Sequence, residues 1–407
     1  MPRYESASEN YIVVKLKSGY NVGVEVSRIK SIVKLETAAP AATTAASPSS
    51  TAQDAGGTEL PRVALISTGG TIASKIDYRT GGVRAALSAS ELYASVPELA
   101  SFASVDPEVL MSEYSENLTP AHWTAIAEKV AEKVKAGNNY AGVVVSHGTD
   151  TMHYTAAALS FALQNLPVPV VLVGAQRSSD RPSSDAALNL IGATAFAARA
   201  EVAGVFVAMH ATTSDDAVAV HVGTRVRKNH TSRRDAFESI DTVPVALVRN
   251  GAIEMQQNNG IELLPRGTRE LKVSAKFDGR VSLLKYYPGF DPALIDHVAA
   301  AGSKAIILEG TGLGHVNRNC FPALEKTIQE KGVAVFMTSQ CIWGRVRMTV
   351  YDTGRDLLEI GVVPLSDMIS ETAVAKAMWA LANAPSADLK RVMQENIAGE
   401  ISEAIPI

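Results

Sequence analysis

Hydrophobic positions along the chain fall into two alternating patterns. Short runs of Val, Ile, Leu and Ala are separated by longer stretches in which apolar residues recur every three or four positions. The first pattern is typical of buried strands and the second of helices, so their alternation predicts an α/β fold built on parallel sheets. Beyond Arg62, strands are expected at 63–67, 142–146, 170–174 and 204–209. Helices are expected at 119–137, with Thr119 as its cap ahead of Pro120, at 155–164 and at 183–200.

A second series of the same kind begins after the pattern fades near Asn250. Its strands are expected at 281–287, 305–310 and 333–339, and its helices at 292–302, 320–332 and 370–384. This series predicts a second, smaller α/β domain.

The first sixty residues differ from the rest. Alternating runs rich in Val and Ile over 11–35 predict a small β unit of two to four strands. From Thr37 to Thr58 the composition shifts to Ala, Thr, Ser, Pro and Gly, which is typical of a flexible linker. The expected order is therefore a small β domain at 1–36, a linker at 37–59, a larger α/β domain at 60–265 and a smaller one at 266–407.

Composition narrows the classes of function. Of 407 residues, 46% are hydrophobic and 20% charged, so the chain can bury large cores and most of it is expected to fold. The 38 basic and 42 acidic residues give a net charge of −4, which counts against an extended grip on nucleic acid. One basic run remains, and we expect it to be a small solvated face: Arg225, Arg227, Lys228, Arg233 and Arg234.

The sequence favours neither a membrane span nor export. Residues 151–176 carry no charge and are long enough to cross a bilayer, but Pro167 and Pro169 divide them into a predicted helix, a turn and a buried strand. The first residues are acidic where a signal peptide needs basic ones. Cys320 and Cys341 lack metal-ligand spacing, and we expect two buried small hydrophobes in a reducing cytoplasm.

Two loops that follow predicted strands carry glycine and hydroxyl side chains, at the sheet edge where ligands of parallel sheets bind. Residues 68–72 read TGGTI; the glycines allow close backbone approach, but the spacing of phosphate-binding loops is absent, and a structural turn is an alternative. Residues 146–151 read SHGTDT and open a helix, which Thr149, Asp150 or Thr151 would also suit as a cap. Together the two loops form a more specific pattern than either alone.

Three histidines could suggest a metal site. However, His147, His153 and His230 have no carboxylate partner at a recognised ligand spacing, so we expect ordinary packed or polar histidines and no metal.

Four segments together resemble the family of L-asparaginase and glutaminase amidohydrolases. They are TGGTIAS at 68–74, HGTDT at 147–151, VPVVLVGAQR at 168–177 and RVRKNHT at 225–231. The resemblance runs from Arg62 to the C-terminus, and the first two motifs, in this order and separation, are highly specific. It implies the two-domain, parallel-sheet asparaginase fold and hydrolysis of a side-chain amide.

The resemblance also implies roles for matching residues. Thr71 would attack the amide as nucleophile, with Tyr78 beside it on a mobile segment. Thr149, Asp150 and Lys228 would form a second constellation. An amine acting as a base needs a lowered pKa, whereas a neighbouring carboxylate favours its charged form, so we expect Lys228 to orient groups or stabilise charge. Which threonine attacks first stays open, and we favour Thr71.

Substrate contacts follow from the same resemblance. Ser115 and Glu116 match positions that hold the α-carboxylate and α-ammonium of the amino acid, and Asp150 would share the ammonium. A helix cap at Ser115 and Glu116 is the alternative, and both can hold at once. The turn at 309–314 resembles a glycine-rich turn of the family, but Leu313 stands where simple asparaginases often carry asparagine, so no catalytic residue is carried over from the second domain.

Within the family, the chain resembles the archaeal branch that serves glutamyl-tRNA(Gln) amidotransferases as their glutaminase subunit. The supporting features are the small β unit with its linker and the segments 115–123 and 228–241. This implies that ammonia from glutamine passes to a partner subunit of the E type, which would hold ATP and Mg²⁺ and make the main contacts to tRNA(Gln). No cofactor is expected in this chain, and a homodimeric core would give a cytoplasmic two-plus-two heterotetramer. The alternatives are a free-standing L-asparaginase and a regulatory module that binds an amino acid without catalysis.

Overall fold

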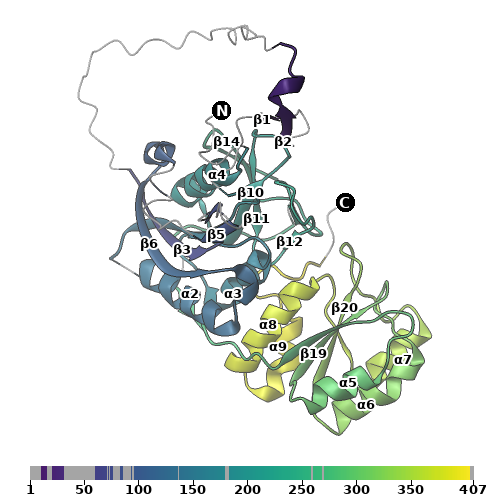
Figure 1. Cartoon of the computed structure of the whole chain (residues 1–407). Coiled ribbons are helices and arrows are strands. Elements are labelled where there is room, and N and C mark those ends of the chain that lie inside the picture. The colour runs from purple at the N-terminus through teal and green to yellow at the C-terminus, as the bar shows by residue number, and fades with distance from the viewer. Residues whose placement is uncertain are drawn as a thin grey trace. The chain divides into compact units, whose positions relative to one another are not determined.

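The chain divides into two compact units, Met1–Leu60 and Pro61–Ile407 (Figure 1). The computed structural model describes residues 11–15, 21–31, 60–70, 72, 74–76, 83–85, 93, 96–135, 137–178, 183–257, 260–267 and 270–403. The predicted linker at 37–59 lies outside the described residues.

The first unit contains a β-hairpin. Strands β1 (Tyr11–Lys15) and β2 (Asn21–Glu25) pair in antiparallel fashion, and the 3₁₀ turn η1 (Val26–Arg28) follows directly. Two strands therefore form in the segment for which alternating Val and Ile predict a small β unit.

The second unit is built on a nine-stranded sheet. Its strand order is β15 (Ala252–Met255), β14 (Ala246–Arg249), β11 (Val218–Val222), β10 (Val202–His210), β9 (Pro169–Val173), β7 (Tyr140–Ser146), β3 (Arg62–Gly69) and β6 (Ser104–Glu113), with β16 (Leu264–Pro265) on β10. Strands β10, β9, β7, β3 and β6 are parallel, and β11, β14 and β15 are antiparallel to their neighbours. The carboxyl ends of the parallel strands thus meet along one edge.

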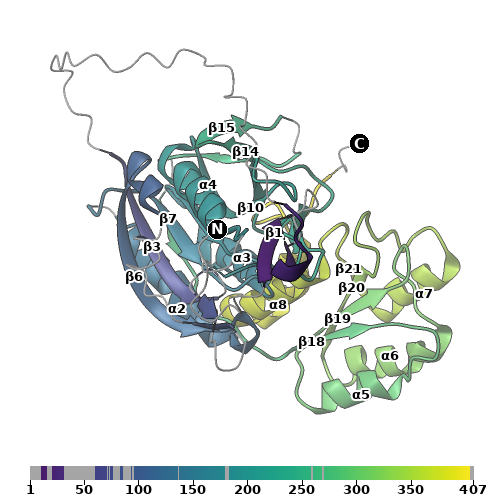
Figure 2. The same cartoon turned by 45° about the horizontal axis from the view of Figure 1, so that its top comes forward.

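A second sheet follows in the C-terminal part (Figure 2). Its four strands are parallel: β18 (Val281–Lys285), β19 (Ala305–Gly310), β20 (Ala334–Ser339) and β21 (Val363–Pro364). One face is covered by α5 (Ala293–Ala300), α6 (Phe321–Gln329) and α7 (Asp352–Ile360), and the other by α8 (Ser370–Asn383) and α9 (Leu389–Gln394). The predicted α/β fold is confirmed, with an all-parallel smaller sheet and a larger sheet that is parallel at its centre and antiparallel at β11, β14 and β15.

Short elements complete the second unit. Three two-stranded ribbons pair β4 (Ser74–Ile76) with β5 (Val83–Ala85), β12 (Val226–Lys228) with β13 (Phe237–Ser239), and β8 (Leu163–Gln164) with β17 (Lys272–Val273). The 3₁₀ turns are η3 (Pro97–Ser101), η4 (Ser115–Asn117), η5 (Arg318–Cys320) and η6 (Ser386–Asp388). The β12–β13 ribbon lies outside both large sheets.

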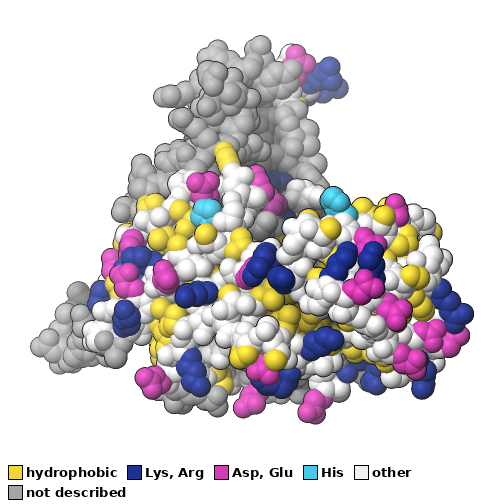
Figure 3. All heavy atoms as spheres, turned by 90° about the horizontal axis from the view of Figure 1, so that it is seen from below, with side chains coloured by type: hydrophobic (Ala, Val, Ile, Leu, Met, Phe, Trp, Pro, Cys, Tyr) yellow, Lys and Arg dark blue, Asp and Glu magenta, His cyan; other side chains and the backbone are white. Residues whose placement is uncertain are grey.

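The surface carries both signs of charge. On the face shown in Figure 3, Lys and Arg side chains are interspersed with Asp and Glu. Cys320 is buried as expected, but the expectation that Cys341 is buried is wrong, because Cys341 lies two residues beyond the end of β20 and is exposed. Among the described residues, no helix combines the length and the apolarity that crossing a bilayer requires.

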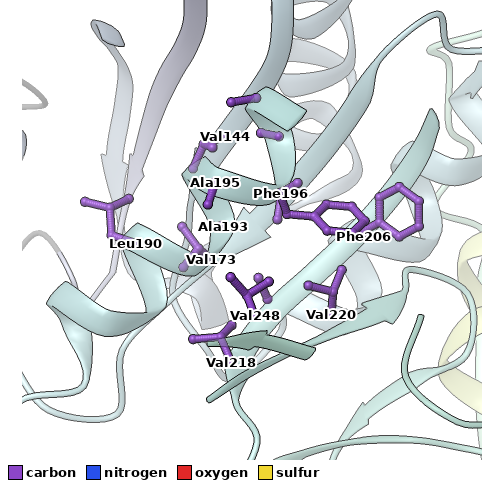
Figure 4. Packing of buried hydrophobic residues seen from close by; sticks show 14 of the residues in the cluster. Val144, Val173, Leu190, Ala193, Ala195, Phe196, Phe206, Val218, Val220 and Val248 are labelled. Carbon is purple, nitrogen blue, oxygen red and sulfur yellow. The ribbon is translucent and has the colours of Figure 1, made fainter. Parts of the chain in front are cut away.

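Alternate residues of each central strand enter different cores. Val144, Val173 and Phe206 pack against α4 (Ala186–Arg199), where the rings of Phe196 and Phe206 meet edge to face with centroids 5.2 Å apart (Figure 4). Their sequence neighbours pack on the opposite face against α2 (Pro120–Lys133) and α3 (Met152–Ala162). Burial on both faces explains why these strands read as continuous apolar runs.

Helix α3 is buried on nearly every side, between the large sheet and α8. Ala156 and Leu159 face the sheet, whereas Ala157 and Phe161 join α8 in a core shared by the two domains. The ring of Phe161 stacks on that of Trp379 with centroids 5.9 Å apart. The second domain therefore packs directly against the helix that follows HGTDT.

Candidate active site

Two glycine turns converge at the carboxyl ends of β3 and β7. Gly70 has a φ of +83°, and a Cβ built there would overlap the backbone nitrogen of Gly148. Thr68 adds a bond between the same strand ends, since its hydroxyl donates to the carbonyl of Ser146 over 2.8 Å. Only glycine tolerates both the positive φ and this approach, so the TGG turn lies directly on the HGT turn.

A third loop joins them from the neighbouring strand β6. A Cβ on Gly148 would lie 2.7 Å from the Cβ of Ser115, the first residue of η4. The hydroxyl of Thr151 donates to the carbonyl oxygen of Ser115 over 2.7 Å. Three parallel strands therefore deliver three loops to one place, as the sheet topology predicts.

Lys228 links the hydroxyl and the carboxylate of the second loop. Its Nζ donates to Thr149 Oγ1 over 2.9 Å and to Asp150 Oδ1 over 2.7 Å. The Lys228 side chain is 8% exposed and that of Asp150 is 66% exposed. A largely buried cation is thus held against a hydroxyl oxygen, where it can stabilise negative charge, while an accessible carboxylate balances it.

Of the four other predicted site residues, the structure describes Ser115 and Glu116. Thr71 and Tyr78 lie outside the described residues. Ser115 is 3% exposed against Gly148, and Glu116 beside it is exposed. Ser115 and Glu116 do not cap α2, because Thr119 is its N-cap residue, as predicted.

The capping alternative for HGTDT holds for the position of Thr151 but not for the side-chain contacts. Helix α3 begins at Met152 with Thr151 as N-cap residue, and no side-chain capping hydrogen bond is formed. The hydroxyl of Thr151 goes to Ser115 instead, and Lys228 binds the side chains of Thr149 and Asp150. These side chains therefore contact other loops and strands rather than the turn of their own helix.

Two buried histidines, one in HGTDT and one in the first turn of α3, carry no charge near neutrality. Burial lowers the pKa of His147 and of His153 to about 4. His147 Nδ1 lies 2.7 Å from the carbonyl of Gly148, and its backbone N–H donates to Val173. His230 accepts the backbone N–H groups of the turn that follows it. These contacts are structural, in line with the sequence-based expectation.

We expect the buried histidines to make the fold acid-sensitive. His147, His153 and His221 each have a pKa near 4 instead of 6.5 because of burial. Between these values the unfolded chain binds more protons, so the free energy of unfolding falls as pH falls from 6.5 to 4, by up to about 1.4 kcal/mol per pH unit for each histidine. Urea titrations at several pH values measure this slope.

His221 offers the control for that prediction. It is 2% exposed, its Nδ1 lies 2.8 Å from the hydroxyl of Ser239, and it forms no part of the hydrogen bonds described for Lys228 and Asp150. His221→Asn should remove about a third of the slope that these three histidines produce in this window. An unchanged slope would contradict the assignment of acid sensitivity to the buried imidazoles.

The expectation of a solvated face is wrong for most of the basic run, of which only Arg233 is exposed. Arg225 is 1% exposed and donates to Asp367 over 3.0 Å. Arg227 donates to Glu371 over 2.6 Å. Arg234 is 5% exposed and binds Asp215. The carboxylates that bind Arg225 and Arg227 lie up to 144 residues away in sequence. The charges of the run taken alone therefore suggested a solvated face.

Asp367 and Glu371 are residues that sequence reasoning missed. They lie just before and within the first turn of α8, four positions apart, which places carboxylates at a helix N-terminus. This spacing was an available signal, but it identifies a helix start rather than a partner for the strand at 226–228.

Comparison with known families follows the architecture. Residues 62–260 match the family described as asparaginase, N-terminal, and residues 280–393 match the glutaminase/asparaginase C-terminal domain. Residues 1–35 match the GatD N-terminal domain. All three parts of the chain thus have counterparts of known type.

Individual relatives differ in how much of the chain they cover. The D subunit of glutamyl-tRNA(Gln) amidotransferase from Pyrococcus abyssi is 48% identical over 99% of this chain and 90% of its own, and that from Pyrococcus furiosus is 47% identical over the same shares. The solved L-asparaginase of Thermococcus kodakarensis has 34% identity and a TM-score of 0.73, covering 84% of this chain and all of its own. L-asparaginase I of Vibrio cholerae has 29% identity and a TM-score of 0.74, covering 84% and 99%.

Proposed function

Because the chain belongs to the family of glutamyl-tRNA(Gln) amidotransferase D subunits, within the asparaginase and glutaminase amidohydrolases, we propose that it is the glutaminase subunit of such an amidotransferase. It hydrolyses glutamine and supplies ammonia to a partner subunit, which converts Glu-tRNA(Gln) to Gln-tRNA(Gln). The match of residues 1–35 to the GatD N-terminal domain carries this choice over a free-standing L-asparaginase.

The chemistry proceeds through an acyl-enzyme. Thr71, activated with the help of Tyr78, attacks the side-chain amide carbon of glutamine, and the tetrahedral intermediate collapses as the carbon–nitrogen bond breaks. The leaving nitrogen takes a proton and departs as ammonia. Water then hydrolyses the ester, which releases glutamate and restores the threonine hydroxyl.

The cluster of Lys228, Thr149 and Asp150 supports this reaction electrostatically. Lys228 donates to Thr149 Oγ1, so the proton of the Thr149 hydroxyl remains available for donation to the reacting group. The ammonium also stabilises negative charge that develops on nearby oxygen atoms. Thr149 orients the reacting group, and Lys228 stabilises the negative charge that develops on it. Asp150 holds the lysine in place through a contact of 2.7 Å.

Substrate selection uses the amino-acid end of glutamine. Ser115 lies against Gly148 beside the cluster, and the exposed Glu116 follows it. Asp150 is accessible, so it can receive the α-ammonium of the substrate while it pairs with Lys228. Ser115 and Glu116 complete the contacts to the α-carboxylate and α-ammonium.

The proposed assembly has two kinds of subunit, because glutamine hydrolysis and tRNA amidation take place on different chains. The partner subunit, of the E type, holds ATP and Mg²⁺ and makes the main contacts to tRNA(Gln), and this chain needs no cofactor of its own. Mixed charge on the face in Figure 3 and a net charge of −4 support a minor role in tRNA binding. We place two copies of this chain with two partner subunits in a cytoplasmic heterotetramer.

Co-expression with the partner subunit tests the function. We expect the complex to amidate Glu-tRNA(Gln) with glutamine as donor, and we expect glutamine hydrolysis to rise when partner and charged tRNA are added. Mass spectrometry of the aminoacyl group and an ammonia assay measure both. Rapid asparagine turnover with no response to partner and tRNA would favour the free-standing asparaginase. Unchanged ammonia release by Thr71→Ala would revive the non-catalytic module.

A further inference from the structure

The ribbon that carries Lys228 presents its side chains alternately to the two domains. Val226 is buried in the core beneath the large sheet, and Lys228 binds Thr149 and Asp150. The intervening Arg227 binds Glu371 of the second domain. This alternation is the two-residue period of a strand, so neighbouring residues of one three-residue strand bind different domains.

The strand is tied to the start of α8 by three neighbouring contacts. Arg225 donates to Asp367 over 3.0 Å, with both side chains at most 1% exposed. Arg227 donates to Glu371 over 2.6 Å. Next to Glu371 along the helix, the Thr372 hydroxyl donates over 2.8 Å to the carbonyl oxygen of the residue before Arg225. The Arg225–Asp367 pair is desolvated and the Arg227–Glu371 pair is partly so, and charge-assisted hydrogen bonds of this kind fix geometry closely.

The ribbon itself is small. Strand β12 pairs with β13 alone in the described sheets and joins neither large sheet. A ribbon of two three-residue strands is marginal by itself, so its placement depends on what it packs against. The contacts to α8 are therefore a main determinant of where Lys228 lies.

The other half of the cluster is supported by the same helix. Thr149 and Asp150 immediately precede the N-cap residue of α3, whose Ala157 and Phe161 pack against α8 in the shared core. Helix α8 thus contacts both elements that bring the lysine and the hydroxyl together.

We propose that Asp367 and Glu371, in the second domain, are positioning residues that set where the Lys228 ammonium meets Thr149 and Asp150. The proposal rests on the proposed function, because it assumes that Lys228 serves glutamine hydrolysis. Glu371 acts through Arg227, and Asp367 anchors the start of the strand through Arg225. Misplacement of a reacting group by about 1 Å can cost about a hundredfold in rate.

Glu371→Gln tests the proposal in the full-length chain bound to its partner. We expect kcat for ammonia release to fall by about 10- to 100-fold and KM for glutamine to change by less than about twofold, because the residues assigned to substrate binding are untouched. Arg227→Gln breaks the same pair from the half-exposed side and should reproduce the loss if the first variant fails to fold. The double variant Arg227→Gln/Glu371→Gln should be no slower than either single variant.

Asp296→Asn is the matched control. It removes a comparable ion pair of the second domain, in which Asp296 of α5 binds Lys331 over 3.0 Å. Helix α5 covers the face of the smaller sheet opposite to α8. The kcat of this variant should stay within about twofold of the parent.

A background without the lysine separates positioning from general destabilisation. In Lys228→Met, the substitution Glu371→Gln should lower the residual rate no further, since Glu371 acts through that side chain. A further loss there, or a kcat for Glu371→Gln within about twofold of the parent, overturns the positioning role. If Lys228→Met itself releases ammonia normally, Lys228 does not serve glutamine hydrolysis and the positioning role is overturned, whereas a parent complex that releases no ammonia from glutamine contradicts the proposed function.

Discussion

Lys228→Met is expected to lower the rate of glutamine hydrolysis by about 10²- to 10³-fold while the chain still folds. The substitution removes a donor that contacts both Thr149 Oγ1 and Asp150 Oδ1, and a positioned donor of this kind is worth about 10²–10³ in kcat. Folding should survive, because Asp150 is two-thirds exposed and water can solvate it once the lysine is gone. An ammonia assay under saturating glutamine measures kcat, and thermal unfolding checks the fold.

Two further variants serve as comparisons for Lys228→Met. Lys228→Arg keeps a cation, but its planar fork differs in reach from an ammonium, so we expect most of the rate to be lost here too. Lys129→Met removes another partly buried, paired lysine of the same domain, which lies on α2 and binds Glu108 over 2.9 Å. Its kcat should be that of the parent. A kcat for Lys228→Met within tenfold of the parent would show that the cluster serves structure rather than hydrolysis.

The central strands were predictable because burial on both faces leaves a local signature. Strand β19 coincides with its predicted range, and β7 and β10 extend theirs by two residues at the start. Strand β6 is not among the predicted strands, since it lies at the sheet edge, is half-exposed and includes Pro107. Proline is tolerated at an edge, where a strand pairs on one side only, so its apolar pattern is weak.

Helix limits were less predictable than the helices themselves. Helix α2 ends at Lys133, before the predicted limit at 137, and α3 begins at Met152 rather than at 155. Apolar periodicity does not mark these ends, because hydrogen bonds from neighbouring loops set them. The bond from Thr151 to the carbonyl of Ser115 is an example.

The candidate site was also predictable only in part. The TGG and HGT turns were predictable from glycines and hydroxyls at strand ends, and the resemblance added Lys228. The pairing of Arg227 with Glu371 spans 144 residues and two domains, and a basic run read alone suggests a solvated surface. Long-range charge pairing is decided by packing, which in this chain brings α8 against the strand at 226–228.

A buried ion pair in the second domain joins two residues that lie outside the sequence motifs discussed above. Lys376 of α8 and Glu400 are both fully buried, 2.5 Å apart. Glu400 also accepts the backbone N–H groups of Ile397 and Ala398, and Lys376 donates to the carbonyl of Met393. The pair therefore fastens the C-terminal segment, which bonds through the carbonyl of Ala398 to Thr224 in the first domain.

Glu400→Gln is expected to lower the free energy of unfolding by about 3–5 kcal/mol, the cost of leaving one charge of a buried pair without its partner. Burial already lowers the pKa of Lys376, and loss of the carboxylate removes the largest interaction that opposes this shift. Urea unfolding of the variant and the parent, at the same protein concentration, measures the difference. Glu254→Gln, which breaks an exposed pair with Arg249, should cost less than about 1 kcal/mol.

Two further measurements identify the cause of that loss. Lys376→Met combined with Glu400→Gln should recover part of the stability, since no uncompensated charge of this pair then remains buried. In Glu400→Gln alone, the folded state favours neutral Lys376, whereas the unfolded chain keeps a lysine of ordinary pKa. Between these two pKa values the unfolded chain binds more protons, so the variant should regain stability as pH rises toward about 10. A loss below about 1 kcal/mol that does not change with pH would mean that water reaches Lys376 and that the C-terminal segment is held by its backbone bonds instead.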